Sequence, residues 1–142
     1  EVRTGVAISD PLQIIATPRG TVSMTPAETA VAELGRIVRE AEAVRVVVGV
    51  PLDREGRPGA QAGKVLAFVE RLRGAVDIDI VTQDERYSTA AAERALIAAD
   101  VRRKKRKQLV DKIAATHILQ TYLDRLAAER KRQESAGSRA DE

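Results

Sequence analysis

The sequence predicts an α/β domain in which a mixed sheet carries helices on both faces. Residues 76–81 alternate polar and apolar side chains, which is the period-2 pattern of a strand. Residues 44–50 form a nearly continuous β-branched run, as expected of a strand buried on both faces of a parallel sheet. Residues 25–28, Thr-Pro-Ala-Glu, have the composition of a helix start, with a threonine cap and a capping-box glutamate. The predicted order is β-β-α-β-α-β-α-α.

The first two strands are predicted at residues 5–9 and 13–17. Asp10-Pro11 supplies a turn between them, and the link is so short that the pair is expected to be antiparallel. Pro18-Arg19-Gly20 indicates a break or bulge, after which the second strand resumes at residues 21–23.

Four helices are predicted from apolar residues at helical spacing and from the helix-breaking residues beside them. They cover residues 25–43, a segment from the 51–59 loop to Gly74, about 89–99 and about 108–129. Residues 1–130 are therefore expected to form one domain. Residues 131–142 are polar, small and charged, which predicts a disordered tail.

The composition of the 142 residues is that of a soluble globular domain, 44% hydrophobic and 32% charged. It has no membrane-length apolar run and no signal-peptide pattern, so we expect no membrane contact; composition leaves the compartment open, although a cytosolic one is natural. The absence of cysteine excludes disulfides, thiolate zinc sites and a cysteine nucleophile. With one histidine, any metal site would use carboxylate oxygens, which suits Mg²⁺ or Mn²⁺.

One segment concentrates positive charge although the net charge is only +3. It consists of six consecutive cations: Arg102, Arg103, Lys104, Lys105, Arg106 and Lys107. Contiguous residues point all around a helix, which favours a phosphate-gripping loop over a helix face. The alternative is a solvated, mobile charge run. With one Phe, two Tyr and no Trp, recognition of bases by aromatic stacking is not expected.

The link between the predicted strand at 76–81 and the next predicted helix contains Asp84, Glu85 and Arg86. Ligands of open α/β sheets bind at this edge, outside the carboxyl ends of the strands. Two adjacent acids are costly to bury without a partner, and a bound cation would supply one. The alternative is a solvated turn.

Asp111 is the second acid of interest, one turn inside the last predicted helix. Ala115, Ile118 and Tyr122 follow it at i+4, i+7 and i+11, so the helix places Asp111 on an apolar face. The alternative is an acid near a helix start that is stabilised by the macrodipole.

Two further features have a functional and a structural interpretation. The loop at residues 49–56 precedes a helix whose N-terminus could hold a phosphate, or it is a plain connection. His117 is expected to be structural or solvated. Two acid sites, a glycine loop and a cationic segment together indicate metal-dependent phosphodiester chemistry, in which carboxylates hold two cations roughly 4 Å apart.

The chain resembles the YqgF/RuvX proteins in motifs that occur in order from Thr4 to about Leu126. The motifs lie at residues 5–11, 16–18, 48–52, 84–86, 88–89, 92–93, 103–105 and 110–111. The resemblance implies an RNase H-like fold, a cytoplasmic bacterial setting and a homodimer. It also implies trimming of precursor 16S rRNA, resolution of four-way DNA junctions, or both.

The resemblance assigns Glu85 and Asp111 as catalytic metal ligands, with Asp84 as a weaker candidate. Family members also carry Asp-X-Gly on a central first strand before Arg-X-Gly-Val-Ala. That strand and its metal-binding aspartate would precede Glu1, and activity is expected only where they are present.

We therefore predict a metal-dependent endonuclease acting on structured RNA or a four-way DNA junction. Lys104, Lys105 and their cationic neighbours would hold phosphates, while Arg86 would pair with an acid or contact the scissile phosphate. Two other hypotheses are a non-catalytic nucleic-acid or ribosome-associated module and an interaction domain without nucleic acid.

Overall fold

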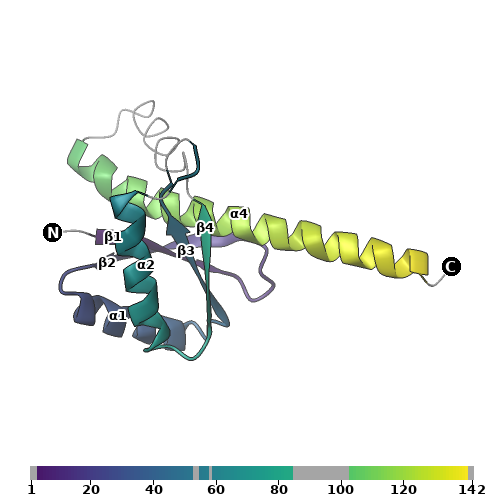
Figure 1. The fold of residues 1–142 in the computed structure, drawn as a ribbon, viewed down its shortest axis with the longest axis horizontal. Coiled ribbons are helices and arrows are strands. Elements are labelled where there is room, and N and C mark those ends of the chain that lie inside the picture. The colour runs from purple at the N-terminus through teal and green to yellow at the C-terminus, as the bar shows by residue number, and fades with distance from the viewer. Residues whose placement is uncertain (1–2, 53–54, 58, 85–102, 141–142) are drawn as a thin grey trace.

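A computed structural model describes residues 3–52, 55–57, 59–84 and 103–140 (Figure 1). For residues 103–109, 111 and 138–140 it describes the backbone only. The predicted helix at about 89–99 lies outside these residues.

Strands β1, Arg3–Ser9, and β2, Ala16–Ser23, form the predicted antiparallel hairpin, but residues 13–15, predicted as the start of the second strand, belong to the turn. Their register shifts where Val6 pairs with Gly20 but Ala7 pairs with Pro18. Arg19 is the extra residue of this bulge, and Gly20 has a φ of 148°, a conformation that side chains other than glycine rarely adopt. The bulge predicted at Pro18-Arg19-Gly20 is confirmed.

The turn between β1 and β2 is ordered by the side chain of Asp10. Its Oδ1 accepts hydrogen bonds from the backbone N–H groups of Ile14, at 2.7 Å, and Ile15, at 2.8 Å. These bonds stabilise the carboxylate and lower the pKa of Asp10 below its ordinary value. The turn itself presents Leu12, Ile14 and Ile15 to solvent.

Strands β3, Arg45–Val50, and β4, Asp79–Asp84, pair in parallel, with Arg45 opposite Asp79 and Val50 opposite Asp84. The antiparallel and parallel pairs were both predicted, but within the described ranges they are two separate two-stranded sheets. Helix α4 packs against β1, β2 and β3 and so joins the two pairs.

Helices α1, Ala27–Glu40, and α2, Ala60–Arg73, contact each other and cover the side of the strands that α4 leaves open (Figure 1). The core between these elements consists of two clusters of buried side chains. One contains Val22, Ala30 and Ile37, and the other contains Val69, Leu72 and Ile80. The predicted threonine cap is wrong: the N-cap is Pro26, and no side chain makes a capping hydrogen bond.

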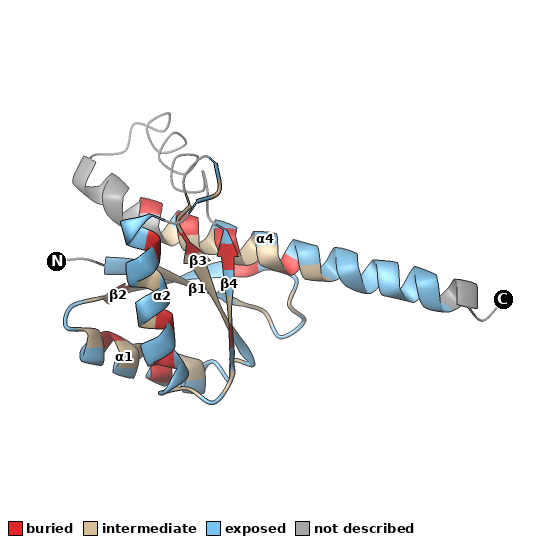
Figure 2. Ribbon diagram, in the orientation of Figure 1, coloured by how far each residue is buried: buried red, intermediate tan, exposed pale blue. Residues whose placement is uncertain are grey.

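Helix α4 runs from Arg103 to Ala140 and corrects two predictions. Its first turns contain Arg103–Lys107, which were expected to form a loop; Arg102 lies outside the described residues. Its last turns contain residues 131–140, which were expected to be disordered. Residues 103–136 include neither glycine nor proline, so nothing in that segment interrupts a helix that the preceding packed turns have already nucleated. Figure 2 shows the C-terminal half of α4 extending from the body with an exposed surface.

Candidate active site

The candidate site is built at the carboxyl ends of the two parallel strands. Val50 ends β3 and Asp84 ends β4, and these two residues are partners in the register. Val50 is buried, whereas Asp84 is exposed. Asp84 is therefore the described acid at the sheet edge where ligands of α/β proteins bind.

The residue before Asp84 attaches this edge to α4. Gln83 is buried, and its Nε2 donates a 2.8 Å hydrogen bond to the backbone carbonyl of Ile118. Its Oε1 accepts a 2.5 Å bond from Nη2 of Arg125. Both ends of the amide are thus satisfied inside the protein, which holds the end of β4 against one stretch of helix.

A second contact joins α4 to the amino ends of the strands. Arg45 at the start of β3 donates a 2.7 Å hydrogen bond to the Tyr122 hydroxyl, and it lies 3.7 Å from the carboxylate of Asp79. The Tyr122 hydroxyl and Asp79 raise the pKa of Arg45. Ile118 and Arg125 thus contact the carboxyl end of β4, Tyr122 contacts the amino end of β3, and α4 crosses the two parallel strands (Figure 1).

The backbone of Asp111 lies on α4, on the N-terminal side of the segment that bonds to the end of β4. Asp111 is seven residues before Ile118, or about 10 Å along the helix axis. It lies in the stripe that also contains Ile118 and Tyr122, both of which bond to the parallel strands. The helical backbone keeps the predicted i+7 and i+11 spacing of Ile118 and Tyr122 from Asp111. The role of Asp111 stays a prediction.

The other assigned residues are placed only in part. Glu85 and Arg86, like Arg102, lie outside the described residues. The backbone of Arg103–Lys107 forms the first turns of α4, immediately before Asp111, so the cationic segment and this acid are neighbours on one helix. His117 is exposed on the same helix. The loop at residues 49–56 is described only in part, and Gly56 has a φ of 82°.

The donor chemistry of the assigned acids fits a hard divalent cation. Asp84, Glu85 and Asp111 offer carboxylate oxygens, the ligands that Mg²⁺ and Mn²⁺ prefer. Among the residues that the structure describes, no three His, Cys, Asp or Glu side chains come together as a metal site. The metal and its ligand set therefore remain a prediction.

Comparison with known proteins identifies the family. The sequence pattern of RuvX, described as a Holliday junction resolvase, matches residues 1–125. The chain belongs to the RuvX family. The α/β, RNase H-like fold class implied by the resemblance is thereby confirmed, with its antiparallel pair, its parallel pair and its flanking helices.

Similar RuvX relatives bear the name "Putative pre-16S rRNA nuclease". One from Natranaerobius thermophilus is 40% identical over 125 residues, which covers 88% of this chain and 89% of the relative. One from Desulforamulus reducens is 46% identical over 120 residues, covering 84% and 88%. One from Roseiflexus sp. is 40% identical over 124 residues, covering 87% and 88%. These names and the family description support a nuclease role on nucleic acid.

Sequence reasoning missed the residues that hold the site together. Gln83, Tyr122 and Arg125 join α4 to the parallel strands, and Gln120 bonds to the backbone of Ile14 and Ala16 at the hairpin. The sequence held one signal for these contacts: Gln83 is a polar residue two positions after Val81, an apolar position of the predicted strand, and so shares its face.

No helix in the described part of the chain has the length and apolarity needed to cross a bilayer.

Proposed function

We propose that this RuvX-family chain is a divalent-metal-dependent endonuclease that cleaves structured nucleic acid, either at the 5′ end of precursor 16S rRNA or at a four-way DNA junction. The observation that carries the proposal is the position of Asp84 at the carboxyl end of β4 together with the helical backbone of α4, on which Arg103–Lys107 shortly precede Asp111. These positions offer acids for a cation and positive charge for the phosphates.

In this proposal Glu85 and Asp111 are the metal ligands, and Asp84 is a weaker candidate. A bound Mg²⁺ or Mn²⁺ would activate water and stabilise the leaving oxygen. The cations of residues 102–107 would hold the phosphate backbone, whose charge dominates the affinity of nucleic-acid binding. Arg86 would pair with one of the acids or contact the scissile phosphate. The setting proposed for this reaction is the cytoplasm.

A homodimer belongs to the junction form of the proposal. A four-way junction contains strands related by two-fold symmetry, and two copies of one chain related by the same symmetry would match them. Light scattering with and without a junction would measure the mass of the complex. A single copy per junction would contradict the dimer.

The decisive experiment measures Mn²⁺-dependent cleavage by the full-length natural polypeptide. The substrates are a precursor 16S rRNA fragment and a four-way DNA junction, and the variants are Glu85→Gln and Asp111→Asn. Asp77→Asn, at an exposed aspartate before β4, is the control that changes charge away from the edge. We expect both site variants to lose cleavage of one substrate while Asp77→Asn retains it.

Binding must be measured beside cleavage, because a non-catalytic module would bind without turnover. If the wild-type protein binds either substrate but cleaves neither at any Mn²⁺ concentration, the catalytic assignment is wrong and a non-catalytic nucleic-acid-binding module is favoured. If nucleic acid is not bound even at low salt, where phosphate contacts are strongest, the endonuclease and the binding module are both wrong and an interaction domain without nucleic acid is favoured.

A further inference from the structure

The last part of α4 is a helical arm outside the segment that the RuvX pattern matches. The match ends at residue 125, whereas α4 continues to Ala140. We define the arm as residues 126–140. Figures 1 and 2 show it projecting away from the sheets, and residues 127–137 are all exposed. Since the side chains of residues 127–137 are exposed, burial explains little of this sequence, and its surface chemistry becomes informative.

The arm carries three consecutive cations, Arg130, Lys131 and Arg132. Among the described residues none of them forms an ion pair, unlike Arg19, Arg36, Arg71 and Arg73. Arg19 and Arg36 pair with Glu40, for example, at 3.2 and 2.8 Å. Positive charge without acidic partners is available for an external anion.

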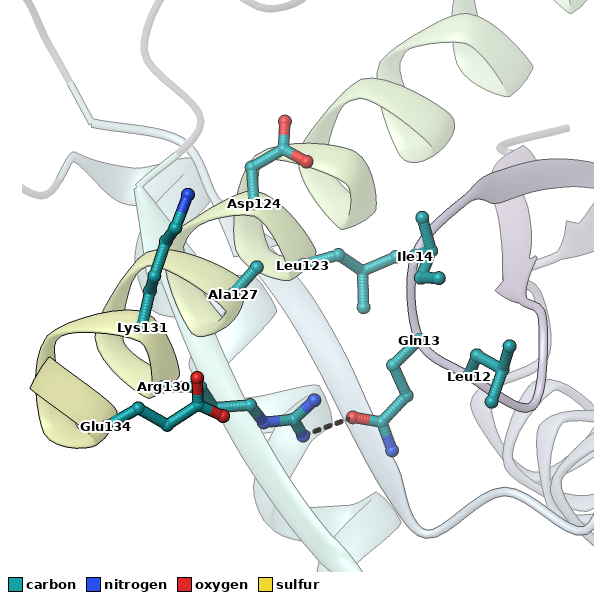
Figure 3. A pocket seen from close by; sticks show the side chains of 9 residues that line it. All are labelled: Leu12, Gln13, Ile14, Leu123, Asp124, Ala127, Arg130, Lys131 and Glu134. Atoms are coloured by element: carbon teal, nitrogen blue, oxygen red, sulfur yellow. Dashed lines mark hydrogen bonds between the residues drawn. The ribbon is translucent and has the colours of Figure 1, made fainter. Parts of the chain in front are cut away.

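The base of the arm is held in place by the hairpin turn. Nη2 of Arg130 donates a 3.0 Å hydrogen bond to Oε1 of Gln13, across a cavity of about 280 Å³ between the turn and α4 (Figure 3). Leu123 lines the same cavity, and Gln120 bonds to the backbone of Ile14 one turn earlier. Figure 3 shows Lys131 pointing away from this contact. The hairpin therefore uses Arg130 as an anchor and leaves Lys131 free to face a partner.

The spacing along α4 relates the arm to the proposed site. From Lys105, in the cationic segment, to Lys131 is 26 residues, or about 39 Å of helix axis. At 3.4 Å per base pair this equals about 11 base pairs of duplex. Two positively charged places at this separation on one helix match two points about one helical turn apart on a duplex.

We propose that Lys131 and Arg132 form a second phosphate-binding point, which contacts the duplex arm of a structured nucleic acid about one helical turn from the catalytic edge. The proposal rests on the nucleic-acid binding in the proposed function, but not on cleavage. It commits to a nucleic-acid backbone because Lys131 and Arg132 are exposed, form no ion pair among the described residues although Glu129 and Glu134 lie on the same arm, and continue a helix that begins with the other cationic segment.

The test compares the Lys131→Gln/Arg132→Gln double variant with a matched control. Glutamine keeps a good helix former at both positions. The control, Lys64→Gln/Arg39→Gln, removes one lysine and one arginine that are likewise exposed and without an ion pair among the described residues, on α2 and α1. Binding to a 24-base-pair DNA duplex is measured in EDTA at several salt concentrations, so that no cleavage occurs.

We expect the double variant to reduce the slope of log K against log salt by about 2, since each lost phosphate contact removes about 0.9. The control should leave the slope as in wild type. A 6-base-pair hairpin duplex, about 20 Å long, cannot reach both points, so its slope should change by less than one. Unchanged thermal unfolding would show that both variants are folded.

Three results would overturn the inference. Equal slopes for the double variant and wild type on the long duplex would exclude phosphate contacts by the arm. An equal reduction of the salt slope in the double variant and in the control would assign the effect to net charge. If the double variant lost affinity only for phosphatidylserine vesicles, and not for the duplex, the arm would be assigned to an anionic membrane surface. If wild type binds no duplex at all, the proposed function fails together with this inference, whereas the first three results leave it standing.

Discussion

Gln83 on β4 donates a 2.8 Å hydrogen bond from Nε2 to the backbone carbonyl oxygen of Ile118 on α4. Its Oε1 accepts a bond from Arg125, so neither end of this buried amide is unsatisfied. The contact joins residues 35 positions apart and lies immediately before Asp84. It therefore positions the end of the strand on the helix that carries Asp111.

Replacing this amide by an apolar side chain of similar length should destabilise the fold. Gln83→Met removes the donor to Ile118 and leaves Arg125 without its acceptor, so the free energy of unfolding should fall by about 1–3 kcal/mol. Urea denaturation measures this change. Gln61→Met, at an exposed position of α2, is the control and should stay within about 0.5 kcal/mol of wild type. Equal stabilities for the two variants would contradict the positioning role of Gln83.

The hairpin turn should make stability depend on pH through Asp10. Because its folded pKa is lowered by the backbone N–H groups of Ile14 and Ile15, the carboxylate contributes stability above its ordinary pKa of 3.8. That contribution is lost as the pH falls through the still lower folded pKa. Asp10→Asn should therefore be less stable than wild type at pH 7, and the two should converge at acid pH.

The measurement is thermal unfolding of wild type and Asp10→Asn between about pH 2 and pH 7. Asp77→Asn, which changes an exposed aspartate before β4, is the control for the loss of one negative charge. A difference between wild type and Asp10→Asn that is constant over the whole range would show that the turn does not depend on the ionised carboxylate.

Leu72 is among the most buried large side chains of α2, with 2% of its surface exposed. It packs with Val69 and Ile80 and so joins α2 to the parallel strands. Leu72→Ala should lower the free energy of unfolding by about 2–5 kcal/mol, since it removes buried methyl groups and leaves a cavity. In Leu66→Ala the same atoms are removed from a side chain that is 43% exposed, so the loss in urea denaturation should be clearly smaller. Equal losses would contradict the described core.

Local patterns were sufficient to find the four described strands and helices α1 and α2, although not all of their ends. The bulge at Pro18-Arg19-Gly20 and the parallel strand at 44–50 were predicted because turn residues and β-branched runs act over a few residues. The extent of α4 was predicted wrongly. The charges of Arg103–Lys107 and the polarity of residues 131–140 were taken as signs of a loop and a tail. A helix that packing has already nucleated continues through such residues, because each added residue costs little.

Sequence alone predicted most of the described elements and the acids to be tested, because periodicity, turn residues and ligand preference are properties of short segments. Tertiary structure decided how α4 is fixed on the parallel strands. Gln83 bonds to Ile118 and Arg45 bonds to Tyr122, contacts that join positions 35 and 77 residues apart. Such contacts arise from packing between elements, and no local pattern encodes them.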